Sequence, residues 1–467
     1  MERKLSEEMC EKYQEFLIDE SKYQGCAQSI SFPECEEEIC QILKQMKEKR
    51  IPVTIQGGKT GITGASVPNQ GHILNLSRMN RILKSDLEKG TITVEPGITL
   101  MDLEKEILRV FGKQKLFWPV QPTEKSASVG GVAATGAQGP NEFFYGDSRQ
   151  YFAAARMVCM DGHVEELNRD TSGDLLNAAL GREGIGGVFT SLTLRLVPKP
   201  EEIWGICFFF QEEDNLAAFA DVLNENCWER EGAQLTVKEY LDKKAFLLIQ
   251  ERKKDMAKIR ELPDIDENCE GMVYLELEGM PDAVEELAEE LMELAAEWDS
   301  DPDTAWALSG EMEVEKLRAF RHAAAESVNL CVEAARKQEP SLTKLGTDYK
   351  YPGKKFSNVL AYYREELVGT GIEYTIFGHL GDAHLHVNLL PKTEAEYQEG
   401  CRLFKKWAKN CQDAGGNLIG EHGIGKLKRE ILRDLLEEKE IQVYRDFKEK
   451  YDPEYLLNPG TIFSEEE

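Results

Sequence analysis

Three glycine-rich segments follow one another between residues 56 and 190, and they constrain the fold more than any other feature of this sequence. Twelve glycines fall between residues 112 and 187, which is too many for ordinary helices. Short runs rich in β-branched residues alternate with these turns, for example at 53–55, 73–76 and 91–94. The stretch from about 51 to 200 therefore predicts an α+β domain whose loops approach a ligand closely.

The first segment, 56–65, follows a predicted strand and reads QGGKTGITGA. Glycines let successive backbone N–H groups turn toward one anion, and two threonine hydroxyls add donors, so this loop suits a pyrophosphate. A nucleotide-triphosphate P-loop ending at Gly58-Lys59-Thr60 would need a glycine at position 53, where Val53 stands. A G-x-G-x-x-G fingerprint is also absent here, which disfavours a Rossmann NAD site.

The second segment, 122–139, contains SVGGVAATGAQG, and its small residues permit a flat ring to lie against the backbone. It leads to Tyr145-Gly146-Asp147. The third segment, 181–190, reads GREGIGGVFT and leads into a strand. Any one of these loops could be an ordinary turn, but three in this order favour a ligand site.

The chain changes character after Pro198-Lys199-Pro200. The order strand, helix, strand, strand, helix, strand is predicted from residue 204 to residue 308, and this is the ferredoxin-like order. The strands are expected at 204–210, 234–237, 272–278 and 304–308, and the helices at 215–227 and 282–297.

The composition excludes several classes of function. The formal charge of −29 disfavours binding to nucleic acids and to anionic membranes. No run approaches the roughly 18 apolar residues that span a bilayer, and the polar start resembles no signal peptide. The eleven cysteines include no Cys-x-x-Cys pair, which disfavours a disulfide framework or an iron–sulfur cluster. We therefore expect a cytoplasmic protein with reduced thiols and no transmembrane segment.

Residues 276–303 carry twelve acids and no base. They predict either a solvated helix face or a docking patch for a basic partner.

Four of the seven histidines lie between residues 379 and 422. Alternation along a strand would place His384, His386 and Asn388 on one face, with His379 on the preceding turn. Imidazoles together with a carboxylate suit a divalent ion such as zinc, manganese or iron(II).

The order of the three glycine-rich segments resembles the FAD-binding domain of the vanillyl-alcohol-oxidase (PCMH-type) flavoproteins. The later motifs resemble the glycolate oxidase, D-lactate dehydrogenase and D-2-hydroxyglutarate dehydrogenase branch. This likeness implies an α+β fold with a PCMH-type FAD-binding domain, a ferredoxin-like substrate (cap) domain and C-terminal helices. It implies non-covalent FAD, because the loops hold no histidine at which a flavin would be tethered.

The resemblance also assigns residues to the cofactor. It places the FAD pyrophosphate on the first loop and the isoalloxazine and adenine portions on the second and third, and the family often has a glycine where Lys59 stands. The implied cofactor-binding residues are Gln56, Gly57, Gly58, Lys59, Thr60, Gly61, Thr63, Gly64, Pro122, Ser128, Gly130, Gly131, Ala134, Thr135, Gly136, Gly139, Tyr145, Gly146, Glu183, Gly184, Gly187, Val188 and Asn458.

The segments at 378–388 and 420–423 are similar to the family motifs GHxGDGNxHxN and GEHG. The resemblance maps the metal ligands onto His379, His386 and Glu421. It maps the catalytic base onto His422 and a substrate contact onto Asn388. Ala383 and His384 stand where the family more often has Gly and Asn, so His384 is a supporting group, a fourth ligand or neither.

A hydroxy acid also needs a cation for its carboxylate, because an unpaired carboxylate in a closed site is costly. Arg318 and Arg321 are candidates, and the family places a carboxylate-binding arginine in this helix, for which we favour Arg321. Lys344 resembles a substrate lysine of the family. It lies four residues before Asp348, whereas the family spacing is two.

These observations predict an FAD-dependent dehydrogenase that oxidises a small D-2-hydroxy acid, D-lactate being favoured, by hydride transfer to flavin N5 with metal-assisted deprotonation. Electrons would pass to a separate acceptor, such as an electron-transfer flavoprotein, an iron–sulfur subunit or a quinone-linked partner. The alternatives are D-2-hydroxyglutarate or glycolate as substrate, an FAD-holding electron-transfer subunit, or a metal-binding structural protein. The expected organisation is an N-terminal helical segment, a PCMH-type FAD-binding domain, a cap domain with the metal site and a segment returning to the flavin domain, at 1–30, 31–200, 201–420 and 421–467.

Overall fold

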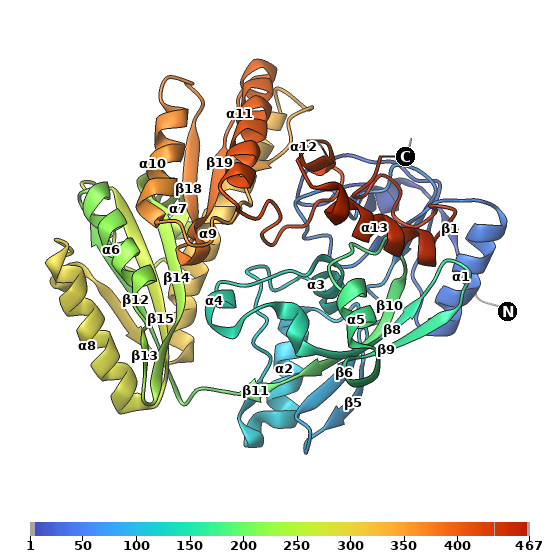
Figure 1. Cartoon of the computed structure of the whole chain (residues 1–467), viewed down its shortest axis with the longest axis horizontal. Coiled ribbons are helices and arrows are strands. Elements are labelled where there is room, and N and C mark those ends of the chain that lie inside the picture. Colours follow the sequence, from blue (N-terminus) through green and yellow to red (C-terminus); the bar gives the residue numbers. More distant parts are fainter. Residues whose placement is uncertain (1–4, 434, 465–467) are drawn as a thin grey trace. The chain divides into compact units, whose positions relative to one another are not determined.

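The computed structural model describes residues 5–433 and 435–464, which form two compact units (Figure 1). Unit 1 runs to Glu142, resumes over Gly146–Lys199 and resumes again from Glu421. Unit 2 consists of Phe143–Tyr145 and Pro200–Gly420. Unit 2 is therefore almost entirely an insertion into the sequence of unit 1.

The first sheet of unit 1 has the strand order β1-β2-β4-β3, in which β2, β4 and β3 run parallel. Parallel strands of one sheet need a crossover connection, and the helix α1 lies in the one from β2 to β3, which lie on the two sides of β4. The buried face of α1 packs in one core with Val53 and Leu74 of the sheet. These elements are β1 (Glu7–Glu8), β2 (Ser29–Ser31), α1 (Glu36–Glu48), β3 (Val53–Gln56) and β4 (His72–Asn75).

The second sheet of unit 1 is antiparallel, with the order β5-β6-β10-β8-β9. Its strands are β5 (Ile82–Asp86), β6 (Thr91–Val94), β8 (Phe152–Val158), β9 (Val164–Asn168) and β10 (Val188–Arg195), and β7 (Leu116–Phe117) pairs separately with β11 (Val197–Pro198). The helices of this part are α2 (Leu100–Phe111), α3 (Val129–Thr135), α4 (Glu142–Tyr145), α5 (Arg169–Ala179), α12 (Arg429–Arg433) and α13 (Glu438–Tyr451).

The predicted polar helix at the N-terminus is wrong for the part that the structure describes. Between residue 5 and β2 the chain forms the short strand β1 and one 3-10 helix over Glu11–Leu17. Tyr13 and Leu17 of this helix are buried with Ile30 and Ile73. Packing of these apolar side chains against the sheet thus outweighs the local preference for an α-helix.

Unit 2 is built on one sheet with the order β16-β12-β15-β14-β18-β19-β17. The strands are β12 (Glu202–Phe210), β14 (Ala233–Asp242), β15 (Gly271–Gly279), β16 (Trp306–Ser309), β17 (Leu345–Gly346), β18 (Tyr374–His379) and β19 (His384–Leu389), with β13 (Glu229–Arg230) beside β14. The first four strands have the fourth-first-third-second order of a ferredoxin-like sheet, so this part of the prediction is confirmed.

The helices of unit 2 cover both faces of its sheet (Figure 1). Phe208 and Phe210 of β12 contact Phe219 of α6 (Glu213–Glu225) on one face. Phe209, between them, shares the opposite core with Phe320 of α9 (Glu311–Arg336). The other helices are α7 (Lys243–Arg252), α8 (Pro281–Glu297), α10 (Phe356–Leu367) and α11 (Glu394–Asp413).

Two further findings bear on function. Over 5–433 and 435–464, no helix combines the length and the apolar character that crossing a membrane requires. The exposed side of α8 carries only acidic charge, from Asp282, Glu285, Glu286, Glu289, Glu290, Glu293 and Glu297.

Candidate active site

The first glycine-rich segment leaves the end of β3 and packs against the second. A Cβ on Gly57 would lie 2.1 Å from Ser128 Oγ, and one on Gly58 would lie 2.7 Å from the carbonyl oxygen of Ser126. Only glycine fits at these two positions, because no real Cβ approaches another heavy atom so closely. The buried Gln56 precedes them as the last residue of β3.

Lys59 follows with a positive φ of 57°. This conformation explains why the family often has a glycine here. The Lys59 ammonium donates to the Glu15 carbonyl at 2.6 Å and lies 4.4 Å from the centre of the Phe16 ring. Burial lowers the pKa of Lys59. The side chain therefore points back into unit 1 and helps to hold the loop in shape.

The second and third segments also meet. The Gly181 and Glu183 amides donate to the carbonyls of Ala133 and Ala134, at 2.9 and 2.6 Å. A Cβ on Gly136 would lie 3.4 Å from the Gly181 Cα. Three segments that are far apart in sequence are thus gathered in one place in unit 1.

The first segment also has an open side. Apart from Gly61 itself and its two chain neighbours, no described residue has a heavy atom within 4 Å of the position that a Cβ on Gly61 would take. Bare backbone that is open on one side is what an approaching pyrophosphate needs, since amide groups can then turn toward its oxygens. The segment fits the phosphate portion of FAD in this respect.

Glu183 and Asn458 use their side chains inside the protein. Asn458 accepts from the Ile55 amide at 2.7 Å and donates to the Glu183 carbonyl at 2.5 Å. The buried Glu183 carboxylate accepts from the amides of Ile424 and Gly425 at 2.7 and 2.8 Å. Burial raises the pKa of Glu183 despite these bonds. The two side chains fasten the end of β3, the third segment and the 421–425 loop to one another.

His422 lies on this 421–425 loop, which touches both ends of the glycine-rich region. A Cβ on Gly425 would lie 2.2 Å from the Thr63 carbonyl oxygen, and one on Gly423 would lie 3.0 Å from Glu183. The His422 Nε2 lies 3.3 Å from a carboxylate oxygen of Glu421. The predicted base therefore stands in the same unit as the predicted flavin-binding segments.

The remaining predicted cofactor residues of unit 1 lie on these same segments, and their contact with FAD stays a prediction. They are Thr60, Thr63, Gly64, Pro122, Gly130, Gly131, Thr135, Gly139, Gly146, Gly184, Gly187 and Val188. Tyr145 differs, because it groups with unit 2, where its hydroxyl donates to Glu278 at 2.5 Å. Burial raises the pKa of Glu278 to about 7.

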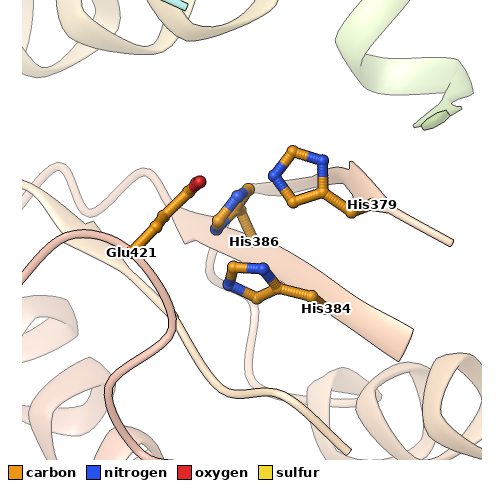
Figure 2. Close-up of side chains that lie close together, drawn as sticks. All are labelled: His379, His384, His386 and Glu421. Atoms are coloured by element: carbon orange, nitrogen blue, oxygen red, sulfur yellow. The ribbon is translucent and has the colours of Figure 1, made fainter. Parts of the chain in front are cut away.

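In unit 2, three histidines lie on the hairpin formed by β18 and β19. Figure 2 draws His379, His384 and His386 together and also labels Glu421, which follows Gly420 in the chain. The centres of the three rings are 4.6 to 5.6 Å apart. Each ring offers a nitrogen, and these nitrogens lie within 4.8 Å of one another. Unit 2 thus gathers three potential metal-ligating imidazoles by itself.

His379 was expected on the turn, but it is the last residue of β18. The reason is its strand pairing, with His384 of β19 on one side and Glu239 of β14 on the other. The turn that follows contains Asp382 and Ala383, which both have positive φ. The glycine that the family often has at position 383 fits this conformation.

Glu239 is the functional candidate that the sequence analysis missed. Its side chain is fully buried and its carboxylate binds two groups, the Nδ1 of His379 and the Nε of Arg321 at 2.5 Å. Burial alone would raise the pKa of Glu239, but Arg321 and His379 outweigh it and lower the pKa. A signal was available, because Glu239 is the only acid among the inward positions Val237, Glu239 and Leu241.

The two candidate arginines of α9 have different partners. Arg318 binds both carboxylate oxygens of Glu276, at 2.8 and 2.6 Å, and reaches Glu311 as well. Arg321 is 6% exposed and lies 5.0 Å from the centre of the Phe377 ring. Glu239 accepts from Arg321 Nε, and the guanidinium carries further N–H donors on its two terminal nitrogens.

Asn388 and Lys344 are placed differently. Asn388 is buried on β19 and donates to the His386 carbonyl at 3.0 Å. The Lys344 ammonium donates to Asn329 at 2.9 Å. Asn329 lies about 12 Å further along α9 than Arg321, at roughly 1.5 Å per residue. The substrate role of Lys344 stays a prediction.

Two known protein families match this chain. Residues 206–462 match the family described as FAD linked oxidases, C-terminal domain, and residues 27–168 match an FAD binding domain. The chain is 28% identical to a D-lactate dehydrogenase of Anaerostipes hadrus, over 98% of each chain. It is 26% identical to the glycolate oxidase subunit GlcD of Bacillus subtilis, over 95% of this chain and 91% of that one.

A D-2-hydroxyglutarate dehydrogenase of Stutzerimonas stutzeri is also 26% identical, over 93% of this chain and 91% of that one. Among solved structures, p-cresol methylhydroxylase with bound substrate has a TM-score of 0.74 at 13% identity, over 99% of this chain and 95% of that one. The 4-ethylphenol oxidase of Gulosibacter chungangensis has a TM-score of 0.71 at 16% identity, over 98% and 94%. These two structures are evidence of fold alone.

The predicted α+β, PCMH-type fold and the predicted family resemblance are both confirmed by these comparisons. The chain carries an FAD-binding domain and is a flavoprotein oxidoreductase. Because the match to the FAD-linked oxidases covers more than half of its residues, this protein belongs to that family.

Proposed function

We propose that this protein is an FAD-dependent dehydrogenase that oxidises a small D-2-hydroxy acid, with D-lactate as the favoured substrate, to the 2-oxo acid. One observation carries the proposal. The buried Glu239 holds Arg321 and His379 on its two sides, so a guanidinium and an imidazole cluster lie next to each other in unit 2. A 2-hydroxy acid carries its carboxylate and its hydroxyl on adjacent carbons, and this spacing suits such a pair. Relatives of this chain act on D-lactate, glycolate and D-2-hydroxyglutarate, as their names state.

Each residue then has a distinct task. Arg321 binds the substrate carboxylate through N–H donors of its guanidinium. Asn388 contacts the substrate from β19. His422 accepts the hydroxyl proton on a ring nitrogen. FAD, when bound, accepts the hydride from C2.

A divalent ion completes the proposal. His379, His386 and Glu421 would hold it, and the donor set suits zinc, manganese or iron(II). Gly420 of unit 2 supports the inclusion of Glu421, because its backbone lies against His384 and Asp348 and Glu421 is the next residue. When bound, the ion lowers the pKa of the substrate hydroxyl.

FAD is proposed to bind non-covalently, since residues 56–65, 122–139 and 181–190 contain neither histidine nor cysteine. Electrons would leave for a separate protein, an electron-transfer flavoprotein or an iron–sulfur subunit. All eleven cysteines are unbridged, and the sequence has no Cys-x-x-Cys pair with which to ligate a cluster of its own. The acidic side of α8 suits a basic partner.

The test is the reduction of purified, FAD-loaded protein without oxygen. D-lactate, L-lactate, glycolate and D-2-hydroxyglutarate are added separately, and bleaching of the flavin is followed with and without a chelator. We expect D-lactate to bleach the flavin fastest and the chelator to slow it. Faster bleaching by glycolate or D-2-hydroxyglutarate would replace D-lactate as the substrate. No bleaching by any 2-hydroxy acid would favour an electron-transfer subunit.

A further inference from the structure

The three histidines of the β18–β19 hairpin are oriented in the same way, each by a contact between one ring nitrogen and an oxygen atom. Each ring uses one nitrogen on a different oxygen of unit 2. His379 Nδ1 binds the carboxylate of Glu239, and His386 Nδ1 lies 3.0 Å from the Thr347 carbonyl. His384 Nε2 lies 3.0 Å from the Asp348 carboxylate. An imidazole that binds a metal through one nitrogen donates from the other, and each of these oxygens is placed to accept that hydrogen bond.

The three rings also lie close enough to share one cation. His384 and His386 are 1% and 5% exposed, and their ring centres lie 4.6 Å apart. Each of the three rings offers one nitrogen, and these nitrogens lie within 4.8 Å of one another.

We propose that His384 is a third imidazole ligand of the divalent ion and binds it through Nδ1, with Asp348 as its supporting carboxylate. The inference rests on the metal of the proposed function and adds a ligand to it. A carboxylate or carbonyl on the other nitrogen is the usual support of a metal-ligating histidine, and His384 has it in the same form as His379. Three nitrogen donors favour zinc, cobalt(II) or iron(II) over magnesium or calcium.

Buried residues around His384 hold its ring in a defined orientation. Asp348 is fully buried, and the residue before it, Thr347, supports His386, so two consecutive residues orient two histidines. A Cβ on Gly420 would lie 2.5 Å from His384 Nε2 and 2.6 Å from Asp348 Oδ1. A residue with any side chain at position 420 would therefore push the pair apart.

The experiment uses the full FAD-loaded chain, stripped with a chelator and titrated with cobalt(II). The variants are His384→Asn, Asp348→Asn and, as a matched control, His163→Asn, which removes an exposed histidine of unit 1. Affinity is measured by chelator competition, and the visible spectrum of cobalt(II) reports the ligands. We expect one ion per chain in the wild type. His384→Asn should lower the affinity by roughly 100-fold and change the spectrum, Asp348→Asn should lower it by about 10-fold, and His163→Asn should change neither.

D-lactate reduction of the flavin in the same samples separates this inference from the proposed function. If His384→Asn keeps the wild-type affinity and spectrum, His384 is not a ligand, and the proposed oxidation stands if D-lactate still bleaches the flavin. If the wild type takes up no cobalt(II), the metal and the third ligand are both overturned. If His384→Asn weakens binding but D-lactate never bleaches the flavin, the ligand assignment stands and the substrate assignment fails.

Discussion

The two candidate binding regions use different chemical groups of the chain, backbone in unit 1 and side chains in unit 2. In unit 1 the glycine-rich segments use bare backbone, and Gly57 and Gly58 pack where no Cβ would fit. In unit 2 the histidine hairpin uses buried ionisable side chains that hold one another, with Glu239 between Arg321 and His379.

The difference predicts how each region responds to mutation. A backbone-built site depends on conformation, so its residues should change stability and cofactor affinity by modest amounts. A side-chain-built site depends on paired charges, and removing one partner leaves the other buried and unpaired.

His422→Ala tests the one reactive side chain that unit 1 contributes. We expect FAD content to be unchanged and flavin reduction by substrate to slow about 1,000-fold, because the hydroxyl proton loses its acceptor. Rapid mixing without oxygen measures the rate. Wild-type reduction kinetics would remove His422 from the mechanism.

Glu278→Gln tests a buried ionisable group of unit 2. The pKa of Glu278 is raised to about 7, so its stabilising contribution is full below its unfolded pKa near 4.5 and is lost as the pH rises through about 7. The variant lacks this titration, and relative to it the wild type should lose about 3 kcal/mol of unfolding free energy between pH 4.5 and pH 8. Urea unfolding at several pH values measures the difference. A constant difference between the two proteins would contradict the raised pKa.

Glu239→Gln tests the residue that joins the two halves of the proposed substrate site. The amide cannot pair with the charge of Arg321, and it gives His379 a weaker acceptor. We expect the cobalt(II) affinity and the rate of reduction by D-lactate each to fall roughly 10- to 100-fold. Glu276→Gln is the matched control, because Glu276 binds the neighbouring Arg318 and not a histidine. Equal losses in both variants would indicate general damage to unit 2.

Asn458→Gly tests the side-chain hydrogen bonds that join the end of β3 to the third glycine-rich segment in unit 1. Glycine tolerates the positive φ of 43° at this position, so the variant isolates the two side-chain hydrogen bonds. Leaving the Ile55 amide and the Glu183 carbonyl without this partner should cost about 2 kcal/mol of stability. Thermal unfolding and FAD titration measure the effect.

Lys59→Ala and Lys59→Gly form a pair that differs by one Cβ. Both lose the contacts of the ammonium with Glu15 and Phe16, but only alanine keeps a side chain at positive φ. We expect the alanine variant to be about 1 kcal/mol less stable than the glycine variant. Equal stabilities in urea unfolding would mean that the loop relaxes to another conformation.

The glycine-rich segments of unit 1 could be predicted from the sequence because their residue type is distinctive. Glycines are needed where φ is positive or where backbones touch, and so their positions outlined the loops. The ferredoxin-like order was predictable for a similar reason, because the period of apolar residues separates strands from helices.

The site around the histidine hairpin of unit 2 could be predicted only in part. Alternation predicted that His384 and His386 share a face, because this is a local property of one strand. Glu239 was missed, because its partner His379 lies 140 residues away and only the pairing of β14 with β18 brings them together. The N-terminal 3-10 helix was also missed, since burial of Tyr13 and Leu17 is decided by distant strands.

The hydrogen bonds of the Asn458 side chain have a consequence for biosynthesis. The ribosome makes β3 and the third glycine-rich segment early, then all of 200–420, and only afterwards the asparagine that ties β3 to Glu183. In a nascent chain the glycine-rich segments therefore lack the hydrogen bonds of Asn458 throughout the translation of unit 2. If FAD binds these segments, we expect its loading to be a late step in maturation, after translation has passed residue 458.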